Sequence, residues 1–155
     1  MSHVTDLKLK VRDLDALEET LAERFPHLEL RKNQKTHAWW GTFVGDSVPP
    51  PGRDPKKFGT CAHAIGRRGF APKNGPGGEW EIGLVPALDG DGFDLLADSY
   101  GGAGRTITQD IPALKREYAC TVATTRAKAK LTRKGWRVER QDLPGNKIRL
   151  KLRKR

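Results

Sequence analysis

Residues Trp80-Glu81-Ile82-Gly83-Leu84-Val85 and Phe93-Asp94-Leu95-Leu96-Ala97-Asp98 flank a stretch of turn-forming residues, Asp89-Gly90-Asp91-Gly92. Both runs have the length and apolar content of strands, and Asp-Gly is a favoured pair in the turn of a β-hairpin. The pattern therefore predicts a hairpin of two antiparallel strands joined by a short turn.

More strands and a helix are expected on the N-terminal side of this hairpin. Alternating apolar residues predict a half-buried strand over residues 5–11. Asp13 is placed to cap a helix that continues to Phe25 and ends at Pro26. Further strands are expected at residues 27–31, 37–44 and 60–65.

On the C-terminal side, a second helix is expected over residues 111–133, with Asp110 as its cap and Pro112 in its first turn. Helical spacing places one set of residues on the core side: Ile111, Leu114, Tyr118, Val122, Thr125 and Ala129. A closing hairpin is expected from residues 136–140 and 147–153, around a turn at 143–146.

The order of these elements predicts the fold class. Strands that cluster, instead of alternating with helices, indicate an α+β fold with a largely antiparallel sheet and two helices, in the order β-α-β-β-β-β-β-α-β-β. The 155 residues suit a single domain, 1–155. Residues 45–58 and 70–78 are rich in Pro and Gly and are expected to be loops.

The formal net charge of +10 is concentrated at one end of the chain. Residues 1–110 contain 14 Lys or Arg and 16 Asp or Glu, whereas residues 111–155 contain 15 and 3. The first part therefore has a net charge of −2 and the second of +12. Such asymmetry indicates a polyanionic partner, although a basic segment can also serve solubility alone.

Within residues 111–155 the cations are expected on two folded faces. Helical spacing gathers one set beside the core side of the second helix: Lys115, Arg116, Arg126, Lys130, Arg133 and Lys134. Strand alternation gathers a second set opposite Ile148, Leu150 and Leu152: Lys147, Arg149, Lys151 and Arg153. We expect these ten residues to contact nucleic-acid phosphates.

Three patterns that could bind ions are better explained by ordinary structure. Cys61-x-His63 lacks the second ligand pair of a zinc site. Residues 99–106 lack the first glycine and the lysine of a phosphate-binding loop, so a flexible connector, or at most a weak anion-binding nest before a helix, is expected there. Residues 89–94 lack the spacing of a calcium-binding loop. We expect no bound metal and no cofactor.

The same reasoning disfavours an enzyme. Asp94 and Asp98, with Glu79 and Glu81 nearby, could form an acid–base pair, but solvated strand carboxylates are commoner. There is no Gly-x-Ser-x-Gly nucleophile elbow, and neither cysteine has a nucleophile signature. The adjacent Trp39 and Trp40 are expected on opposite sides of a strand. A sheet packed on both faces is favoured over an exposed aromatic that stacks on bases.

Several short segments also resemble a known family of unknown function. In chain order they are Met1-Ser2-His3, Trp80–Leu84, Phe93–Asp98, Tyr118-Ala119, Gly135–Glu139 and Ile148–Leu152. They are similar to the hypothetical chloroplast open reading frame thirty-five family (domain of unknown function twelve fifty-seven) of cyanobacteria, algal plastids and bacteriophages. Ser99-Tyr100 replaces the family's tryptophan pair, and residues 45–58 and 70–78 look like insertions.

That resemblance implies a strand-helix-sheet fold and a bacterial, phage or plastid setting, and it brings no reaction. Two cysteines, no apolar run of membrane-spanning length and no signal-peptide pattern at the N-terminus lead us to expect a cytoplasmic protein without a membrane partner. A bacterial or phage-infected cell, or a plastid stroma, would fit.

Two functional hypotheses remain, with a hydrolase at Asp94 and Asp98 as a third class. The first is a non-enzymatic accessory module that binds RNA or DNA through the basic helix-hairpin unit of residues 111–155. The alternative is a protein-binding adaptor, or a structural component of a phage virion or motor-ATPase assembly, that meets an acidic protein surface.

Overall fold

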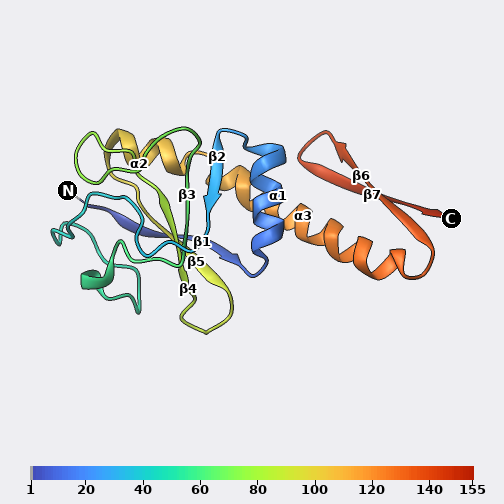
Figure 1. Ribbon diagram of the computed structural model, residues 1–155, viewed down its shortest axis with the longest axis horizontal. Coiled ribbons are helices and arrows are strands. Elements are labelled where there is room, and N and C mark those ends of the chain that lie inside the picture. The colour runs from blue at the N-terminus through green and yellow to red at the C-terminus, as the bar shows by residue number, and fades with distance from the viewer. Residues whose placement is uncertain (1) are drawn as a thin grey trace.

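The computed structural model describes residues 2–155 and has an α+β fold around a five-stranded antiparallel sheet (Figure 1). The strands lie in the order β1-β5-β4-β3-β2, and every neighbouring pair is antiparallel. Their bounds are Val4–Val11 (β1), Leu28–Arg31 (β2), His63–Arg67 (β3), Ile82–Pro86 (β4) and Phe93–Asp98 (β5). The predicted fold class is confirmed.

The predicted hairpin of β4 and β5 is confirmed, and it lies inside this sheet. Gly83 pairs with Leu96 and Leu84 with Leu95, while the intervening turn places Gly90 at φ 77°. Because side chains alternate along a strand, Leu84 and Leu95 face one side of the sheet and Leu96 the other. The two sides join two separate apolar clusters, so the sheet is covered on both faces.

Helices cover the first face. Helix α1 (Leu14–Arg24) is capped by Asp13, whose carboxylate accepts a hydrogen bond from the Ala16 amide at 2.9 Å, as predicted. Leu17 and Leu21 of α1 pack fully buried against the sheet, and Leu114 of α3 (Ile111–Thr132) joins them.

Loops cover the second face, and here the expected strand at residues 37–44 is wrong. None of residues 37–44 belongs to a strand, and an isolated bridge, between Thr36 and Thr60, comes just before them. Its amides bond to side chains instead of a neighbouring strand: Ala38 donates to Glu81 at 2.8 Å and Trp39 to Asn74 at 3.0 Å. The segment therefore lies across the sheet as a covering layer, together with the loop that contains the short 3-10 helix η1 (Pro55–Lys57).

The expected flexible connector at residues 99–106 is also wrong, because α2 (Gly101–Thr108) occupies it. Asp98 accepts a hydrogen bond from the Tyr100 amide at 3.0 Å and so orders the start of this helix. A Cβ at Gly104 would lie 2.4 Å from the carbonyl carbon of Ser99, so this glycine permits the close approach of α2 to the end of β5.

The second predicted helix is present as α3, but its cap and part of its core side differ. The Asp110 side chain makes no cap bond and instead contacts His27 at 2.6 Å. Thr121 and Thr124 are buried, whereas Thr125 and Ala129 are exposed and Val122 is half-buried. After Tyr118, α3 extends beyond the sheet (Figure 1). There it packs against α1 and the closing hairpin, so the residues that face these two elements are the buried ones.

The closing hairpin consists of β6 (Trp136–Leu143) and β7 (Lys147–Lys154), paired in register over all eight residues. After Gly135, at φ 79°, the chain turns back, and β6 returns along α3 toward α1 (Figure 1). No helix in residues 2–155 combines the length and the apolar character needed to cross a bilayer.

Candidate functional site

The closing hairpin has two different faces. Directly paired residues of antiparallel strands share a face, so Val138 and Leu152 lie together and Arg140 lies with Leu150. The β6 part of this inner face packs on α3, and Val138 is only 7% exposed, whereas Leu152 of β7 is 48% exposed. The alternate residues form the outer face, which points away from α3.

Carboxylates of the basic segment fix the hairpin to the body of the protein. Glu117 of α3 pairs with Arg140 at 2.7 Å and with Arg24 of α1 at 3.5 Å. Asp142 in turn pairs with Arg24 at 2.8 Å and Arg140 at 2.9 Å. Burial opposes the charge of Arg140, but its hydrogen bonds with Glu117 and Asp142 outweigh this and raise its pKa.

All three acidic side chains of residues 111–155 therefore take part in ion pairs. The third one, Glu139, pairs with Arg137 at 3.1 Å. Of the 15 cations in this segment, Arg137 and Arg140 have carboxylate partners, and within residues 2–155 the other 13 have none. These 13 include all ten predicted site residues.

The outer face of the hairpin carries the most regular set of these cations. Lys147, Arg149, Lys151 and Arg153 alternate along β7 and are all exposed. Their cross-strand partners on the same face are Leu143, Gln141, Glu139 and Arg137. We call the four β7 cations the outer-strand face. The strand pairing places this face opposite Ile148 and Leu150, as expected from the sequence.

The predicted cations of α3 lie on another side of the unit. Lys115 is half-buried, and the other five are exposed: Arg116, Arg126, Lys130, Arg133 and Lys134. At about 100° per residue they spread over roughly 100°, away from Glu117 and Thr124, which face β6 and α1. We call these six residues the helix face.

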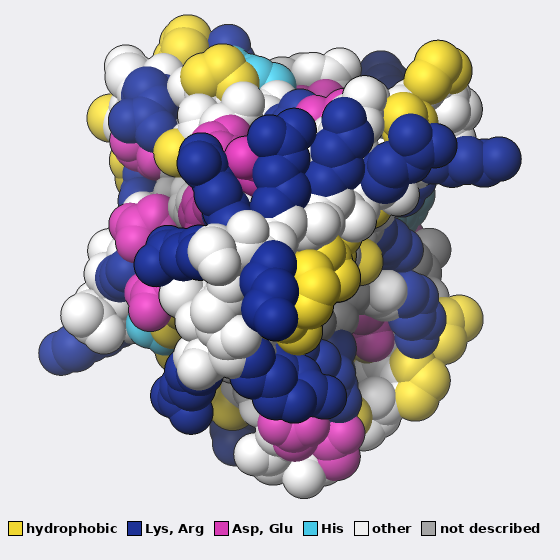
Figure 2. Space-filling view, turned by 90° about the vertical axis from the view of Figure 1, so that its right-hand side faces the viewer, with side chains coloured by type: hydrophobic (Ala, Val, Ile, Leu, Met, Phe, Trp, Pro, Cys, Tyr) yellow, Lys and Arg dark blue, Asp and Glu magenta, His cyan; other side chains and the backbone are white. Residues whose placement is uncertain are grey.

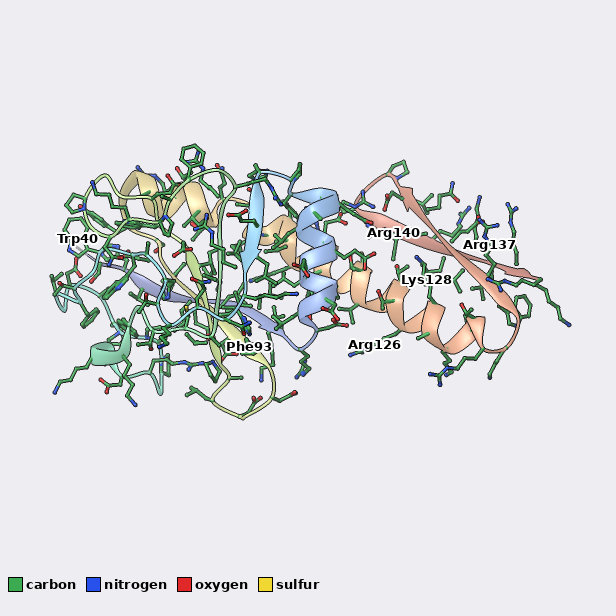
Figure 3. All side chains as sticks on the ribbon, viewed as in Figure 1. Trp40, Phe93, Arg126, Lys128, Arg137 and Arg140 are labelled. Atoms are coloured by element: carbon green, nitrogen blue, oxygen red, sulfur yellow. The ribbon has the colours of Figure 1, made fainter. Side chains whose placement is uncertain are left out.

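The outer-strand face and the helix face point in nearly opposite directions, so they do not merge into one continuous surface. In Figure 3, Arg126 extends from α3 on the side away from the hairpin, whereas Arg137 extends from the far side of the hairpin. Figure 2 looks onto this end of the molecule and shows Lys and Arg side chains in its upper, middle and lower parts, with uncharged surface between them.

A shallow groove of about 350 Å³ borders the helix face, and no sequence pattern indicated it. It runs between α3 and the end of β1, with Lys115 and Arg126 along one side and Lys10 and Arg12 along the other. Lys10 and Arg12 are paired with Asp89 and Asp91 of the β4–β5 turn, which leaves the α3 cations as the unpaired charges of this groove.

The acidic candidates have structural partners. Asp94 pairs with Arg53 at 2.5 Å. Asp98 is 1% exposed and accepts hydrogen bonds from the backbone amides of His3, Tyr100 and Trp40. Both carboxylates therefore help to hold the loops to the sheet. Glu81, 3% exposed, does the same by pairing with Arg31 at 2.7 Å.

Cys61 and His63 enter different surroundings, because β3 begins only at His63. Cys61 packs with the loop-side cluster that contains Val85 and Leu96. The His63 ring contacts Phe93, and its Nδ1 accepts a hydrogen bond from the Asn33 amide at 3.0 Å. No group of three potential ligands for a metal ion occurs within residues 2–155.

The two tryptophans are both used in packing. Trp39 is 6% exposed and meets the Phe58 ring edge-to-face. Trp40 is half-buried, edge-to-face with Trp80 and Tyr100. Within residues 111–155, three cations without a carboxylate partner were missing from the predicted set: Lys128, Lys154 and Arg155. Lys128 lies between α3 and the hairpin (Figure 3).

Comparisons with protein-family models, with curated proteins and with solved structures each find no match. The family resemblance of the short sequence segments stays a prediction. What the chain does must be argued from its charge distribution and its geometry.

Proposed function

We propose that the protein is a non-enzymatic module that binds the phosphate backbone of nucleic acid. The outer-strand face is the principal contact, and the helix face is a second one. One observation carries the proposal: within residues 2–155, no carboxylate pairs with Lys147, Arg149, Lys151 or Arg153. The acidic side chains of residues 111–155 are all engaged in ion pairs with other residues.

The spacing of the outer-strand face suits a phosphate backbone. Alternate residues of a strand are about 6.8 Å apart, so the four side chains span roughly 20 Å. Phosphates of a duplex follow one another at about 3.4 Å of axial rise per strand, so long cationic side chains at this spacing can reach several of them. Contacts of this kind position a protein without reading bases.

The hairpin is also rigid enough to present these cations together. Strand β6 packs on α3, Arg140 of β6 is paired with Glu117 of α3, and β7 pairs with β6 over its full length. Ordering is therefore largely complete before binding, which lowers the entropic cost of association. A two-stranded ribbon supported on one face is in addition a shape that the major groove of a duplex admits.

The test compares two charge-reversal variants with equal change in net charge. The first replaces the outer-strand face, as K147E/R149E/K151E/R153E. The control reverses four exposed cations of the body that have no carboxylate partner within residues 2–155: Lys35, Lys56, Lys73 and Arg105. Binding is measured by fluorescence anisotropy with a labelled duplex and a labelled single-stranded RNA.

We expect the outer-strand variant to lose at least about 100-fold in affinity and the control to lose much less, because the contacts are local. Equal losses would show that only net charge matters, and no salt-dependent binding by the native protein would reject the proposal.

The adaptor alternative has one observation of its own. Leu152 is 48% exposed beside the free edge of β7, where an acidic protein segment could dock. A pull-down after nuclease treatment separates the two functions, since a protein partner stays bound and a nucleic-acid-bridged one is lost.

A further inference from the structure

The basic unit of residues 111–155 projects from the five-stranded sheet, so two of its sides are accessible. After Tyr118, α3 extends beyond the sheet, and the closing hairpin lies along one side of this part of the helix (Figure 1). The outer-strand face is on the side of the hairpin that points away from α3. Part of the helix face lies on the projecting half of α3. We call this part the distal helix face, and its members are all exposed: Arg126, Lys130, Arg133 and Lys134.

The distal helix face and the outer-strand face lie on opposite sides of this unit. The hairpin side of α3 is marked by Glu117, which is paired with Arg140 of β6 at 2.7 Å, and by Lys128, which lies between α3 and the hairpin in Figure 3. At about 100° per residue, the distal helix face is centred roughly 160° around the helix from that side. Figure 3 agrees, since Arg126 extends away from the hairpin.

The two faces keep their positive charge. Within residues 2–155, no cation of either face pairs with a carboxylate. Helix α3 contains one acidic residue, Glu117, and it faces the hairpin. On the outer side of the hairpin, Glu139 lies across from Lys151 but is paired with Arg137 at 3.1 Å. Each side of the unit is therefore a cationic surface of its own, suited to a phosphate backbone.

A single short duplex cannot contact both faces. Helix α3 with its side chains is about 10–12 Å across, and the hairpin adds a further layer between the two faces. A duplex of about 16 base pairs is only about a tenth of the DNA persistence length of about 150 base pairs, so it stays nearly straight. To reach from one face to the other, it would have to turn back around the unit. Two separate segments can bind instead, one on each side.

We propose that this unit bridges two nucleic-acid segments, with one phosphate backbone on the outer-strand face and another on the distal helix face. This inference rests on the proposed function, because both contacts are made to phosphates. It adds an activity to that function: the protein holds two duplexes, or two distant parts of one long duplex, side by side. On a long duplex the second contact is intramolecular, so two weak contacts on one rigid unit reinforce each other.

The test uses the full chain and two DNA duplexes of about 16 base pairs, one biotinylated and bound to beads and the other fluorescent. Bridging is measured as the fluorescent duplex captured on the beads. Binding to one duplex is measured separately by fluorescence anisotropy. We expect capture to rise with protein concentration and to fall again at protein excess, because each duplex then carries its own protein molecules. Capture by an aggregate would not fall.

Two neutral variants with the same change in net charge separate the faces. The first removes the distal helix face but keeps helix-forming side chains, as R126Q/K130Q/R133Q/K134Q. The control removes exposed cations of the body, as K35Q/K56Q/K73Q/R105Q. We expect both to bind one duplex with affinities within about threefold of each other, because the outer-strand face is intact. Capture should fall at least about tenfold in the first variant and stay near the native level in the control.

Three results would contradict bridging. Equal capture by the two variants overturns the proposal, because the distal helix face would then not be the second contact. Binding of one duplex by the native protein without any capture of a second overturns bridging and leaves the proposed function standing. The absence of any duplex binding in the anisotropy measurement rejects the proposed function, and bridging with it.

Discussion

Burial of His37 predicts a specific dependence of folding stability on pH. The imidazole is 6% exposed, and burial lowers its pKa from 6.5 to about 4. Glu81, which accepts a hydrogen bond from the adjacent Ala38 amide at 2.8 Å, is paired with Arg31 at 2.7 Å. The folded state therefore resists protonation of His37, whereas the unfolded state accepts a proton at the ordinary pKa.

The sign and magnitude follow from proton linkage. Above pH 6.5 neither state is protonated at His37, so stability is at its full value. As pH falls from 6.5 toward 4, the unfolded state binds a proton that the folded state does not, and stability is lost. Each pKa unit corresponds to about 1.4 kcal/mol, so the complete loss is about 3 kcal/mol.

The assay is urea unfolding followed by tryptophan fluorescence, from about pH 7.5 to about pH 4.5. The native protein and the His37→Leu variant are compared, and the slope with pH is the readout, so any intrinsic cost of the substitution drops out. Burial, aided by Lys32, also lowers the pKa of His63, but both proteins share that contribution.

We expect the native protein to lose about 2–3 kcal/mol more than the variant over this range. Parallel curves would refute the reasoning, because they would mean that His37 is hydrated or partnered in the folded protein.

Two other substitutions test local packing and the anchoring of the hairpin. Gly83→Ala should destabilise the protein by about 1–3 kcal/mol, because its Cβ would meet His37, whereas Gly102→Ala, with open space around it, should be neutral or stabilising in a thermal melt. Arg140→Met should cost about 1–2 kcal/mol through loss of the Glu117 pair, and it should increase hydrogen exchange in β6 and β7 far more than in the central sheet.

Local signals in the sequence were sufficient where neighbouring residues determine the structure. The Asp13 cap and the Gly90 turn act within a few residues, so their elements were predicted correctly. The alternation of cations and apolar residues in β7 likewise fixed which residues share a face.

The failures arose where distant residues decide. The segment 37–44 has strand-like composition, but Glu81, Asn74 and Asp98 supply side-chain acceptors for its amides, and sequence alone does not reveal such long-range bonds. The Gly-rich stretch at 101–104 reads as a connector until Asp98 is known to order its first turn.

The cationic unit was predicted in composition but not in shape. Helical spacing placed its cations on one face of α3, but which side of α3 the hairpin covers depends on Glu117, Arg24 and Arg140. That tertiary contact separates the helix face from the outer-strand face. A hollow of about 440 Å³ beside η1, lined by β1, β4, β5 and the loop around η1, was missed for the same reason, since its lining comes from distant segments of the chain.

The salt dependence of nucleic-acid binding tests the central claim most directly. Affinity for a duplex is measured against salt concentration for the native protein and for the neutral variant K147Q/R149Q/K151Q/R153Q. If each of the four side chains neutralises one phosphate, the slope of log affinity against log salt should become shallower by about 3–4 units in the variant. An unchanged slope and affinity would contradict the assignment of the outer-strand face as the nucleic-acid contact.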